Sequence, residues 1–405
     1  MDPLSYLQRM RDRHGDVFTV RPLNGAPSVI VSDPELIKQV FTAPADVLHA
    51  GDCNRQTLGW LLGEDSLLLL DEQRHIEHRR LLLPSFHRDR LESHADAMRT
   101  LADRHVDSWP TGEEVETLPL LRALTLEVVL DAVFGNSEKG AGRALRDLLP
   151  APLLMANTGD GDAPASHAAV DRAKTLIGDE VATRRVEAGP EQRDDILSQL
   201  LAARYEDGSG LSDGEVRDEL LTLIVAGTGT TSNSLAWALE RLARAPEALA
   251  QAAAEAANGG GPYATAVIYE AMRMRPAVPI LARLVMQPFR MGEHSISPGR
   301  IVAPSPLLVH YRPDIYPDPM SFRPERFLKR EPGTYTWMPF GGGVRRCIGS
   351  SFALLEMRVI LAALLSRMTP RAIGDEPEEM RLRGNALVPS GGASLVFDRA
   401  VPGNS

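Results

Sequence analysis

The longest continuous helical pattern in the sequence restricts the fold more than any other feature. Ser212 followed by Glu215 forms a capping-box pattern, which marks the start of a helix. Apolar residues then recur at helical spacing until Pro246 ends the run. At about 1.5 Å per residue this helix would be roughly 50 Å long, so we expect one central helix that crosses the whole molecule.

The middle of this segment is unusual for a helix. Residues 227–234 read Gly-Thr-Gly-Thr-Thr-Ser-Asn-Ser, and each glycine costs about 1 kcal/mol relative to alanine in a helix interior. A kinked structural helix is one explanation. We favour the other, a site where a ligand approaches the backbone closely and meets hydroxyl groups.

Most of the chain shows helical periodicity, and strand patterns lie near its two ends. Residues 17–20 and 28–31 flank Asn24-Gly25, which is a hairpin signal. Near the C-terminus, a turn at 389–392 precedes a strand pattern at 394–397. The predicted fold class is therefore mainly α with a smaller β portion drawn from both ends of the chain.

Length and composition fit one large globular unit. The 405 residues contain no repeat, low-complexity tract or long linker. The candidate breaks at 158–164, 206–210 and 258–262 are short and resemble loops between helices. We therefore interpret residues 1–405 as a single domain.

Charge and cysteine content exclude several classes of function. The net charge of −10 argues against nucleic acid or an anionic membrane as the main partner, because both need a basic face. Two cysteines, Cys53 and Cys347, cannot form a disulfide framework, which favours a reducing cytoplasm. The N-terminus lacks an apolar signal core, and charged residues interrupt the apolar segment 350–368, so we expect no membrane anchor.

The loop around Cys347 carries the strongest chemical signal. Residues 338–349 read Met-Pro-Phe-Gly-Gly-Gly-Val-Arg-Arg-Cys-Ile-Gly, and glycines on both sides let backbone amides approach the sulfur. A helix that starts just after Cys347 would point its positive end at the sulfur, and Arg345 adds a nearby cation. Both favour a thiolate, which is a good axial ligand for haem iron. The alternative for a lone cysteine is a small buried hydrophobe.

This loop resembles the haem-binding loop of cytochromes P450. Phe340, Gly343, Arg345, Cys347 and Gly349 stand at the family's positions. The resemblance covers the chain from about residue 3 to residue 397. It implies the P450 fold, with the long central helix over a haem b whose iron is bound by Cys347.

Two further segments are similar to P450 motifs that support the cysteine loop. Glu270-Ala271-Met272-Arg273 matches the family's Glu-x-x-Arg helix, and residues 322–327, Phe-Arg-Pro-Glu-Arg-Phe, match the segment that supplies a second arginine. The resemblance implies a buried cluster of Glu270, Arg273 and Arg326. An exposed pair worth a few tenths of a kcal/mol is the alternative for Glu270 and Arg273.

Haem propionates need cations, and the chain offers four candidates. His75 and Arg79 share one helix face because they are four residues apart. They match the family's His-x-x-x-Arg, and Arg283 and Arg345 are similar to the other two propionate ligands. The cofactor-binding residues implied are Cys347, His75, Arg79, Arg283, Arg345, Phe340, Gly341, Ala226 and Gly349. We expect His78 to face solvent or a partner, and Cys53 to be a free structural thiol.

The resemblance also implies the chemistry of the long helix. Ala226-Gly227-x-x-Thr230-Thr231 looks like the family's oxygen-binding segment, in which Thr230 would hydrogen-bond O₂, the co-substrate. The family usually has an acid just before this threonine, and here it is Gly229. Water chains, a substrate hydroxyl, Thr228 or Thr231 could take over its part in proton delivery. The catalytic candidates are therefore Thr230, Gly229 and Thr231.

The expected activity is monooxygenation of a hydrophobic small molecule, of terpenoid, fatty-acid or polyketide type, in secondary metabolism. No flavin- or nicotinamide-binding region is visible, so electrons would come from a ferredoxin and its reductase. We expect the protein to be a monomer. A docking patch could form from Arg79, Arg80, Arg88, Arg90 and Arg346, although a solvated run of charges is the alternative. The apolar or small pocket candidates are Leu61, Leu62, Ala226, Val278, Ile280, Leu281, Leu387 and Val388.

Three other functions remain open. A peroxide-driven peroxygenase would need no redox partner. An oxidative cyclase or coupling enzyme is made more plausible by Gly229. A haem sensor or carrier is disfavoured by the helix centred on Thr230, because a carrier has no need of proton delivery.

Overall fold

The computed structural model describes residues 2–21, 26–149, 164–187, 193–329 and 331–400. Its helices are α1 (Pro3–His14), α2 (Pro34–Phe41), α3 (Gly51–Leu58), α4 (Glu72–Leu82), α5 (Arg88–Asp107), α6 (Thr117–Phe134), α7 (Gly140–Leu148), α9 (Pro164–Val186), α10 (Ile196–Ala202), α11 (Asp213–Ala243), α12 (Pro246–Ala257), α13 (Pro262–Met274), α14 (Pro306–Val309) and α15 (Ser350–Leu365). Its strands are β1 (Val17–Val20), β2 (Ser28–Val31), β3 (Leu48–His49), β4 (Glu114–Glu116), β5 (Arg283–Val285), β6 (Phe289–Met291), β7 (His294–Ile296), β8 (Ile301–Pro304), β9 (Met368–Ala372), β10 (Met380–Arg383), β11 (Ala386–Pro389) and β12 (Ser394–Arg399).

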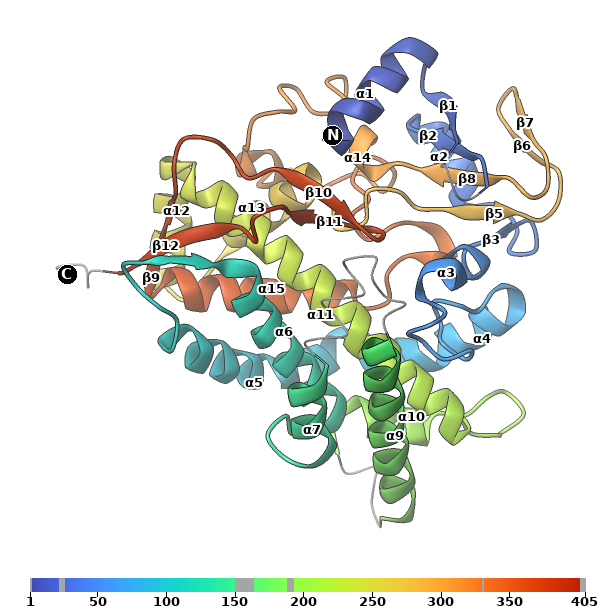
Figure 1. Cartoon of the computed structure of the whole chain (residues 1–405), viewed down its shortest axis with the longest axis horizontal. Coiled ribbons are helices and arrows are strands. Elements are labelled where there is room, and N and C mark those ends of the chain that lie inside the picture. The colour runs from blue at the N-terminus through green and yellow to red at the C-terminus, as the bar shows by residue number, and fades with distance from the viewer. Residues whose placement is uncertain (1, 22–25, 150–163, 188–192, 330, 401–405) are drawn as a thin grey trace.

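The predicted long helix is α11, which runs through the middle of the molecule (Figure 1). Ser212 is its N-cap, and the capping box with Glu215 is complete in both directions. At about 1.5 Å per residue, α11 spans about 46 Å. A β-carbon on Gly227 would lie 3.0 Å from Cγ2 of Val129, so this glycine lets α6 pack close to α11. The close packing of α6 against α11 therefore explains the glycine at position 227.

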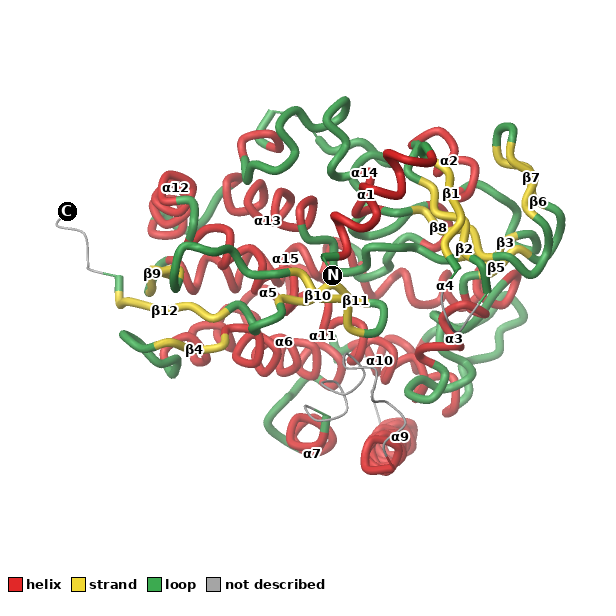
Figure 2. The backbone as a smooth tube through the Cα atoms, turned by 45° about the horizontal axis from the view of Figure 1, so that its top comes forward, coloured by secondary structure: helices red, strands yellow, loops and turns green. Residues whose placement is uncertain are grey.

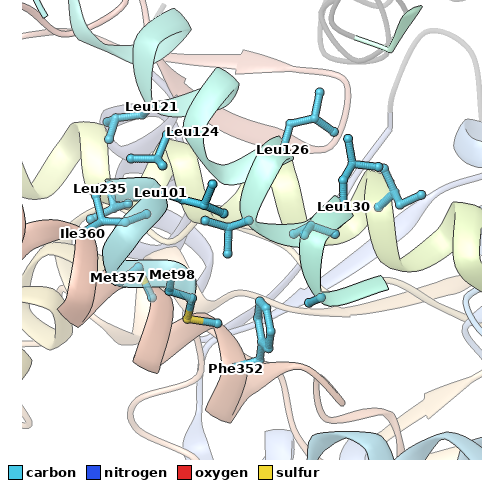
Figure 3. Packing of buried hydrophobic residues seen from close by; sticks show 14 of the residues in the cluster. Met98, Leu101, Leu121, Leu124, Leu126, Leu130, Leu235, Phe352, Met357 and Ile360 are labelled. Atoms are coloured by element: carbon cyan, nitrogen blue, oxygen red, sulfur yellow. The ribbon is translucent and has the colours of Figure 1, made fainter. Parts of the chain in front are cut away.

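The core lies where α5, α6, α11 and α15 pack against one another. Leucines of α6 meet Met98 and Leu101 of α5, Leu235 of α11 and Phe352 of α15 (Figure 3). Helix α6 is buried on nearly all sides, as expected for a helix that is apolar all round. Helix α15 begins just after the cysteine loop, so this bundle anchors both α11 and the loop.

Strands from distant parts of the chain form the sheets (Figure 2). The largest sheet has the order β1-β2-β8-β5-β3, in which β2 and β8 are parallel. A second sheet has the order β4-β12-β9, and β10 and β11 form a hairpin. The predicted strands near both chain ends are confirmed. The turn at Asn24-Gly25 and the break at 158–163 lie outside the described residues.

The late apolar segment is a buried helix followed by a strand rather than a membrane span. It divides into α15 and β9, and Glu356 of α15 is fully buried. Among the helices of the described residues, none is long and apolar enough to cross a membrane.

Candidate functional site

The cysteine loop is a tight turn held against α2. The Cys347 amide donates to the carbonyl of Phe340 at 2.9 Å, which closes the loop. Gly341 and Gly343 have φ of +69° and +65°, in the region that favours glycine. A β-carbon on Gly342 would collide with the ring of Phe41, and one on Gly343 would collide with its carbonyl. Gly342 and Gly343 therefore allow close contact with α2, whereas the predicted approach of a backbone amide to the sulfur is made by Gly349.

Cys347 is exposed as a residue, although protein atoms surround its sulfur. Burial raises the pKa of the Cys347 thiol, and three groups act against this effect. The Gly349 amide donates to the sulfur, and the charges of Arg79 and Arg346 favour the thiolate. The guanidinium of Arg345, which was predicted to lie near the sulfur, binds the carboxylate of Asp71 and the carbonyl of Leu70.

The four predicted propionate ligands lie close enough to interact electrostatically, although they come from three separate segments. His75 of α4 is buried, and desolvation followed by the charges of Arg345, Arg79 and Arg283 lowers its pKa to about 3. His75, Arg283 and Arg345 also line one small cavity. Burial lowers the pKa of Arg283 and of Arg345 to about 10 each. Three guanidinium groups outnumber the carboxylates of Asp71, which pairs with Arg345, and of Glu72, which lines the same cavity, so the region suits a ligand with carboxylates of its own.

The threonines of α11 do not all face the same way. Ala226 and Thr230 are exposed on one side of the helix, whereas Thr228 and Thr231 are buried. The Thr230 hydroxyl donates to the carbonyl of Ala226 at 2.8 Å, which leaves its lone pairs free to accept. The Thr228 hydroxyl donates to the carbonyl of Ile224 at 2.7 Å, within the helix. Of these three threonines, Thr230 is the one that a ligand can reach on this face.

Glu270, Arg273 and Arg326 come together as a buried cluster. Arg273 binds both oxygens of Glu270, with Nε 2.7 Å from Oε2 and Nη2 2.8 Å from Oε1. Arg326 Nε lies 3.2 Å from Oε1 of Glu270. Glu270 and Arg273 are both 0% exposed, so the alternative of an exposed pair does not hold.

His310 connects this cluster to the cysteine loop, and sequence reasoning missed it. Its Nε2 lies 2.8 Å from the amide of Met338, which can only donate, so Nε2 accepts and Nδ1 carries the proton. Nδ1 then donates to the carbonyl of Arg273 at 3.0 Å. Burial, followed by the charge of Arg273, lowers the pKa of His310 to about 3, which keeps the ring neutral. A single histidine gave no pattern from which this role could be predicted.

His78 does not face solvent, contrary to prediction. It is buried between α4 and α11, with Nδ1 3.3 Å from Glu219 and Nε2 3.2 Å from Glu215. The Tyr205 hydroxyl also lies 2.8 Å from its Nε2. Burial raises the pKa of Glu219 to about 7, while contacts with Glu219 and Glu215 raise that of His78 despite its burial. The helix repeat places His78 on the α11 side of α4, and only the packing of the two helices reveals that.

Cys53 is a free thiol near the propionate-type cluster. Its side chain is half-buried on α3, and burial raises its pKa to about 11. The charge of Arg283 opposes this shift. A neutral thiol is what a structural cysteine would be.

The predicted pocket residues fall into two groups. Leu61 and Leu62 are buried in the main core, and Leu387 is buried in a cluster with Tyr311 and Met274. Val388 is also buried. The partly or fully accessible candidates are Ala226, Val278, Ile280 and Leu281. Their contact with a substrate remains a prediction.

The predicted docking arginines differ in their surroundings. Arg80 forms an exposed ion pair with Glu206, and Arg90 Nη1 lies 2.7 Å from Asp194. Arg346 is exposed beside the sulfur, and Val344 of the same loop is exposed as well. The side chain of Arg88 lies outside the described part of the structure.

An accessible cysteine in a glycine-rich loop, with cations beside it and a helix carrying an open threonine face, fits the haem-thiolate class of oxidoreductases. A family model for cytochrome P450 matches residues 1–397. Cytochrome P450 135B1 of Mycobacterium tuberculosis is 36% identical over 409 residues, covering 97% of this chain and 86% of that protein. Cytochrome P450 137 of the same organism is 35% identical over 405 residues, covering 96% and 84%.

Solved structures show the same fold. A cyanobacterial P450, CYP120A1 with retinoic acid bound, has a TM-score of 0.86 at 23% identity and covers 97% of this chain and 94% of its own. The haem domain of cytochrome P450DA has a TM-score of 0.85 at 24% identity, with coverage of 98% and 93%. This chain therefore belongs to the cytochrome P450 family, whose members are haem monooxygenases with a thiolate-ligated iron.

Proposed function

We propose that this P450 inserts one oxygen atom from O₂ into a hydrophobic small molecule, with Cys347 as the iron ligand. The observation that carries the proposal is the meeting of Cys347 with the arginines of α4 and of its own loop. These groups come from separate parts of the sequence, and their convergence on one sulfur supports the binding of a thiolate-ligated cofactor there. Thiolate-ligated haem, when bound, supplies the activation of O₂.

Haem b fits the residues around Cys347. His75, Arg79, Arg283 and Arg345 would hold the propionates, through neutral imidazole in the case of His75 and charge-assisted bonds in the others. Phe340, Gly341 and Gly349 would lie against the proximal side of the ring. Ala226, with its small side chain on the open face of α11, would leave room on the distal side.

Proton handling would depend on Thr230. Its hydroxyl can accept a hydrogen bond at the open face while it donates to the carbonyl of Ala226. Gly229 offers no carboxylate, and buried Thr231 does not share this face. Water or a hydroxyl of the substrate would therefore have to bring protons to Thr230, with ordered water counting nearly as much as a direct bond.

The substrate class that we propose is an apolar natural product of terpenoid, fatty-acid or polyketide type, consumed in secondary metabolism. The accessible pocket candidates Ala226, Val278, Ile280 and Leu281 are small or apolar. The structural relative CYP120A1 is described with retinoic acid bound. We further propose a cytoplasmic monomer, folded as one domain, that receives electrons from a ferredoxin at the face that carries Arg346.

Oxidative ring formation or coupling on the same scaffold is the second candidate, favoured by Gly229. A peroxide-driven reaction would need no ferredoxin. A surrogate ferredoxin and reductase with NADPH, compared with hydrogen peroxide alone, separates the two electron sources. The absence of product with either electron source, despite normal haem loading, would favour a sensor or carrier.

The axial-ligand assignment has a direct spectroscopic test. Cys347→Ser and Cys347→His should both lose the thiolate-type absorption of the reduced carbon monoxide complex, because neither side chain donates electrons as sulfur does. Cys53→Ser is the matched control and should keep that absorption. Retention of the thiolate-type spectrum in Cys347→Ser would move the assignment to Cys53.

A further inference from the structure

Helix α4 carries two of the proposed propionate ligands but has little apolar surface to hold it in place. Its buried residues are His75, His78 and Leu82. Two of these three are histidines, so Leu82 is the one fully buried apolar side chain of the helix. Because apolar contacts are non-directional, a single leucine does not fix the rotation of a helix about its axis. Polar contacts of α4 therefore determine its orientation.

His78 and the two ligand residues occupy one arc of α4. At about 100° per residue, His75 lies between the other two, with His78 about 60° to one side and Arg79 about 40° to the other. His78 faces α11, whereas the charge of Arg79 reaches Cys347 in its loop. A rotation of α4 that moved His78 away from α11 would turn Arg79 and His75 by the same angle.

Two carboxyl groups of α11 hold the two ring nitrogens of His78. Nδ1 lies 3.3 Å from Oε1 of Glu219, and Nε2 lies 3.2 Å from Oε1 of Glu215. The Tyr205 hydroxyl lies 2.8 Å from the same Nε2 and donates to Oε1 of Glu215 at 3.0 Å. Glu215 and Glu219 are about one helical turn apart, so the ring is held at two points along α11. This attachment fixes both the height and the rotation of α4 against α11.

The contact between His78 and Glu219 depends on a proton that the two groups share. Nδ1 faces a carboxyl oxygen, so a hydrogen bond forms only while the ring nitrogen or the carboxyl group carries the proton. The second oxygen of Glu219, Oε2, is buried and has no hydrogen-bond partner in the described part of the chain. Burial raises the pKa of Glu219 to about 7. Burial lowers the pKa of His78, but its contacts with Glu219 and Glu215 outweigh this effect, and the net shift is upward.

Other titratable and charged groups surround this pair from each neighbouring element. They are His75 and Arg79 of α4, Asp218 of α11, and Tyr205 with Arg74 and Glu77 nearby. Burial followed by nearby arginines keeps the pKa of His75 at about 3, so that ring stays neutral, and Asp218 pairs with Arg217 at 2.7 Å. Burial raises the pKa of Tyr205, which stays protonated. The proton that leaves this cluster near neutral pH therefore comes from the pair of His78 and Glu219.

We propose that His78 is a positioning residue for the cofactor, whose bonds to Glu219 and Glu215 set the rotation of α4 and direct Arg79 and His75 toward the haem propionates. The inference rests on the proposed haem site and adds a residue outside the proposed propionate ligands. Both groups of the pair have pKa values above their ordinary ones, so the link is intact at lower pH. It is lost as the pH rises through the folded-state values.

The rate at which haem transfers to apomyoglobin, measured with the haem-loaded protein between about pH 6 and 9, tests the inference. At about pH 6, His78→Phe should release haem about tenfold faster than wild type, as expected when one charge-assisted contact is misplaced. The wild-type rate should rise with pH toward that of the variant, which should lack this rise. His78→Gln, which can still bond to one glutamate, should lie between the two.

Two further variants separate positioning from stability. Thr222→Val is the matched control, because it removes a buried hydrogen bond of 2.7 Å between α11 and Ser66 without touching α4. Its haem transfer should match wild type at every pH. The double variant His78→Leu with Glu219→Leu replaces the pair by apolar groups, a change that is often neutral for stability. It should resist denaturant as wild type does, yet release haem as fast as His78→Phe. If it does not load haem, the rate and pH profile of His78→Gln decide.

Four outcomes would overturn the inference. These are wild-type haem transfer in His78→Phe, a pH-dependent rise that persists in this variant, recovery of haem retention in the double leucine variant, or an equal effect of Thr222→Val. Arg79→Gln distinguishes this failure from failure of the proposed haem site. Faster transfer in Arg79→Gln with an unchanged rate in His78→Phe would uphold the site and reject the role of His78. Normal retention in Arg79→Gln would contradict the propionate assignment of Arg79 itself.

Discussion

Glu356 is a buried carboxylic acid whose surroundings do not satisfy its hydrogen-bonding groups. It is 0% exposed on α15, and neither carboxylate oxygen has a hydrogen-bond partner. Desolvation raises its pKa well above the ordinary value, so the group is held in its neutral form. A carboxylic acid in this condition makes the stability of the protein depend on pH.

The sign of that dependence follows from proton linkage. The folded-state pKa lies above the unfolded one, so between the two values the folded state keeps a proton that the unfolded state has lost. Stability therefore falls as pH rises through this window, by up to about 1.4 kcal/mol per pH unit, and levels off above the folded pKa. Glu356→Gln should show a shallower fall between pH 5 and 8 in denaturant unfolding. Exposed Glu379→Gln is the control, and equal slopes in all three proteins would contradict a neutral Glu356.

The second prediction at the scale of single residues concerns Gly229 and Thr230. Thr230→Ala should divert reducing equivalents to peroxide, because the accessible hydroxyl is lost. Gly229→Asp should lower product formation or change the product, since we expect glycine here to make room for substrate or to suppress protonation. Thr228→Ser, with its hydroxyl bound inside the helix, should change neither the share of reducing equivalents lost to peroxide nor the product formed. Improved coupling in Gly229→Asp, with the same product and unchanged substrate affinity, would show that the missing acid is merely a defect.

At the scale of elements, His310 connects α13 to the cysteine loop through hydrogen bonds. The ring bridges the carbonyl of Arg273 and the amide of Met338, and Arg273 Nη1 donates back to the His310 carbonyl at 2.8 Å. The Glu270 cluster thereby gains a rigid connection to the loop that carries Cys347. His310 is thus a positioning residue in our proposal, since it touches neither the sulfur nor the ligand face of α11.

Replacement of His310 should disturb the loop more than it disturbs the fold. His310→Phe leaves a buried donor and a buried acceptor unpaired, which should cost about 1–3 kcal/mol for each. In His310→Phe, the carbon monoxide complex should lose its thiolate-type absorption faster than in the wild type. His310→Asn should partly restore the lifetime of that absorption. Tyr311→Phe is the matched control, because it removes the hydrogen bonds of the Tyr311 hydroxyl with Met274 and Arg275 in the same segment without touching the loop. An equally labile spectrum in Tyr311→Phe would mean that the effect is general.

Elements with a local signal could be predicted, and those defined by contacts could not. The capping box at Ser212 determines where α11 begins, and the Cys347 motif is continuous in sequence. His78 and His310 acquire their surroundings only when segments that are distant in sequence pack together. Arg345 shows the same limit, since its rotamer points to Asp71 rather than to the adjacent sulfur.

At the scale of the whole molecule, the proposed haem site draws its residues from three separate segments of the chain. His75 and Arg79 come from α4, Arg283 begins β5, and Arg345 precedes Cys347. Without a carboxylate-bearing ligand, the guanidinium groups near His75 repel one another, and Asp71 offsets only part of that repulsion. Haem would therefore act as a cross-link between the first and the last thirds of the chain, because a ligand that binds only the folded state stabilises it by mass action.

This arrangement predicts that one substitution has opposite effects on the two forms of the protein. Arg283→Gln removes a buried cation, so the haem-free protein should unfold at the same or a higher temperature than wild type. The haem-loaded protein should lose a charge-assisted bond of about 1.5–3 kcal/mol, and haem should transfer to apomyoglobin about ten- to a hundredfold faster. Arg290→Gln, in the β6–β7 hairpin with an exposed side chain, should change neither form. Equal destabilisation of both forms by Arg283→Gln would assign Arg283 to the packing of β5 and would leave the propionates to Arg79, Arg345 and His75.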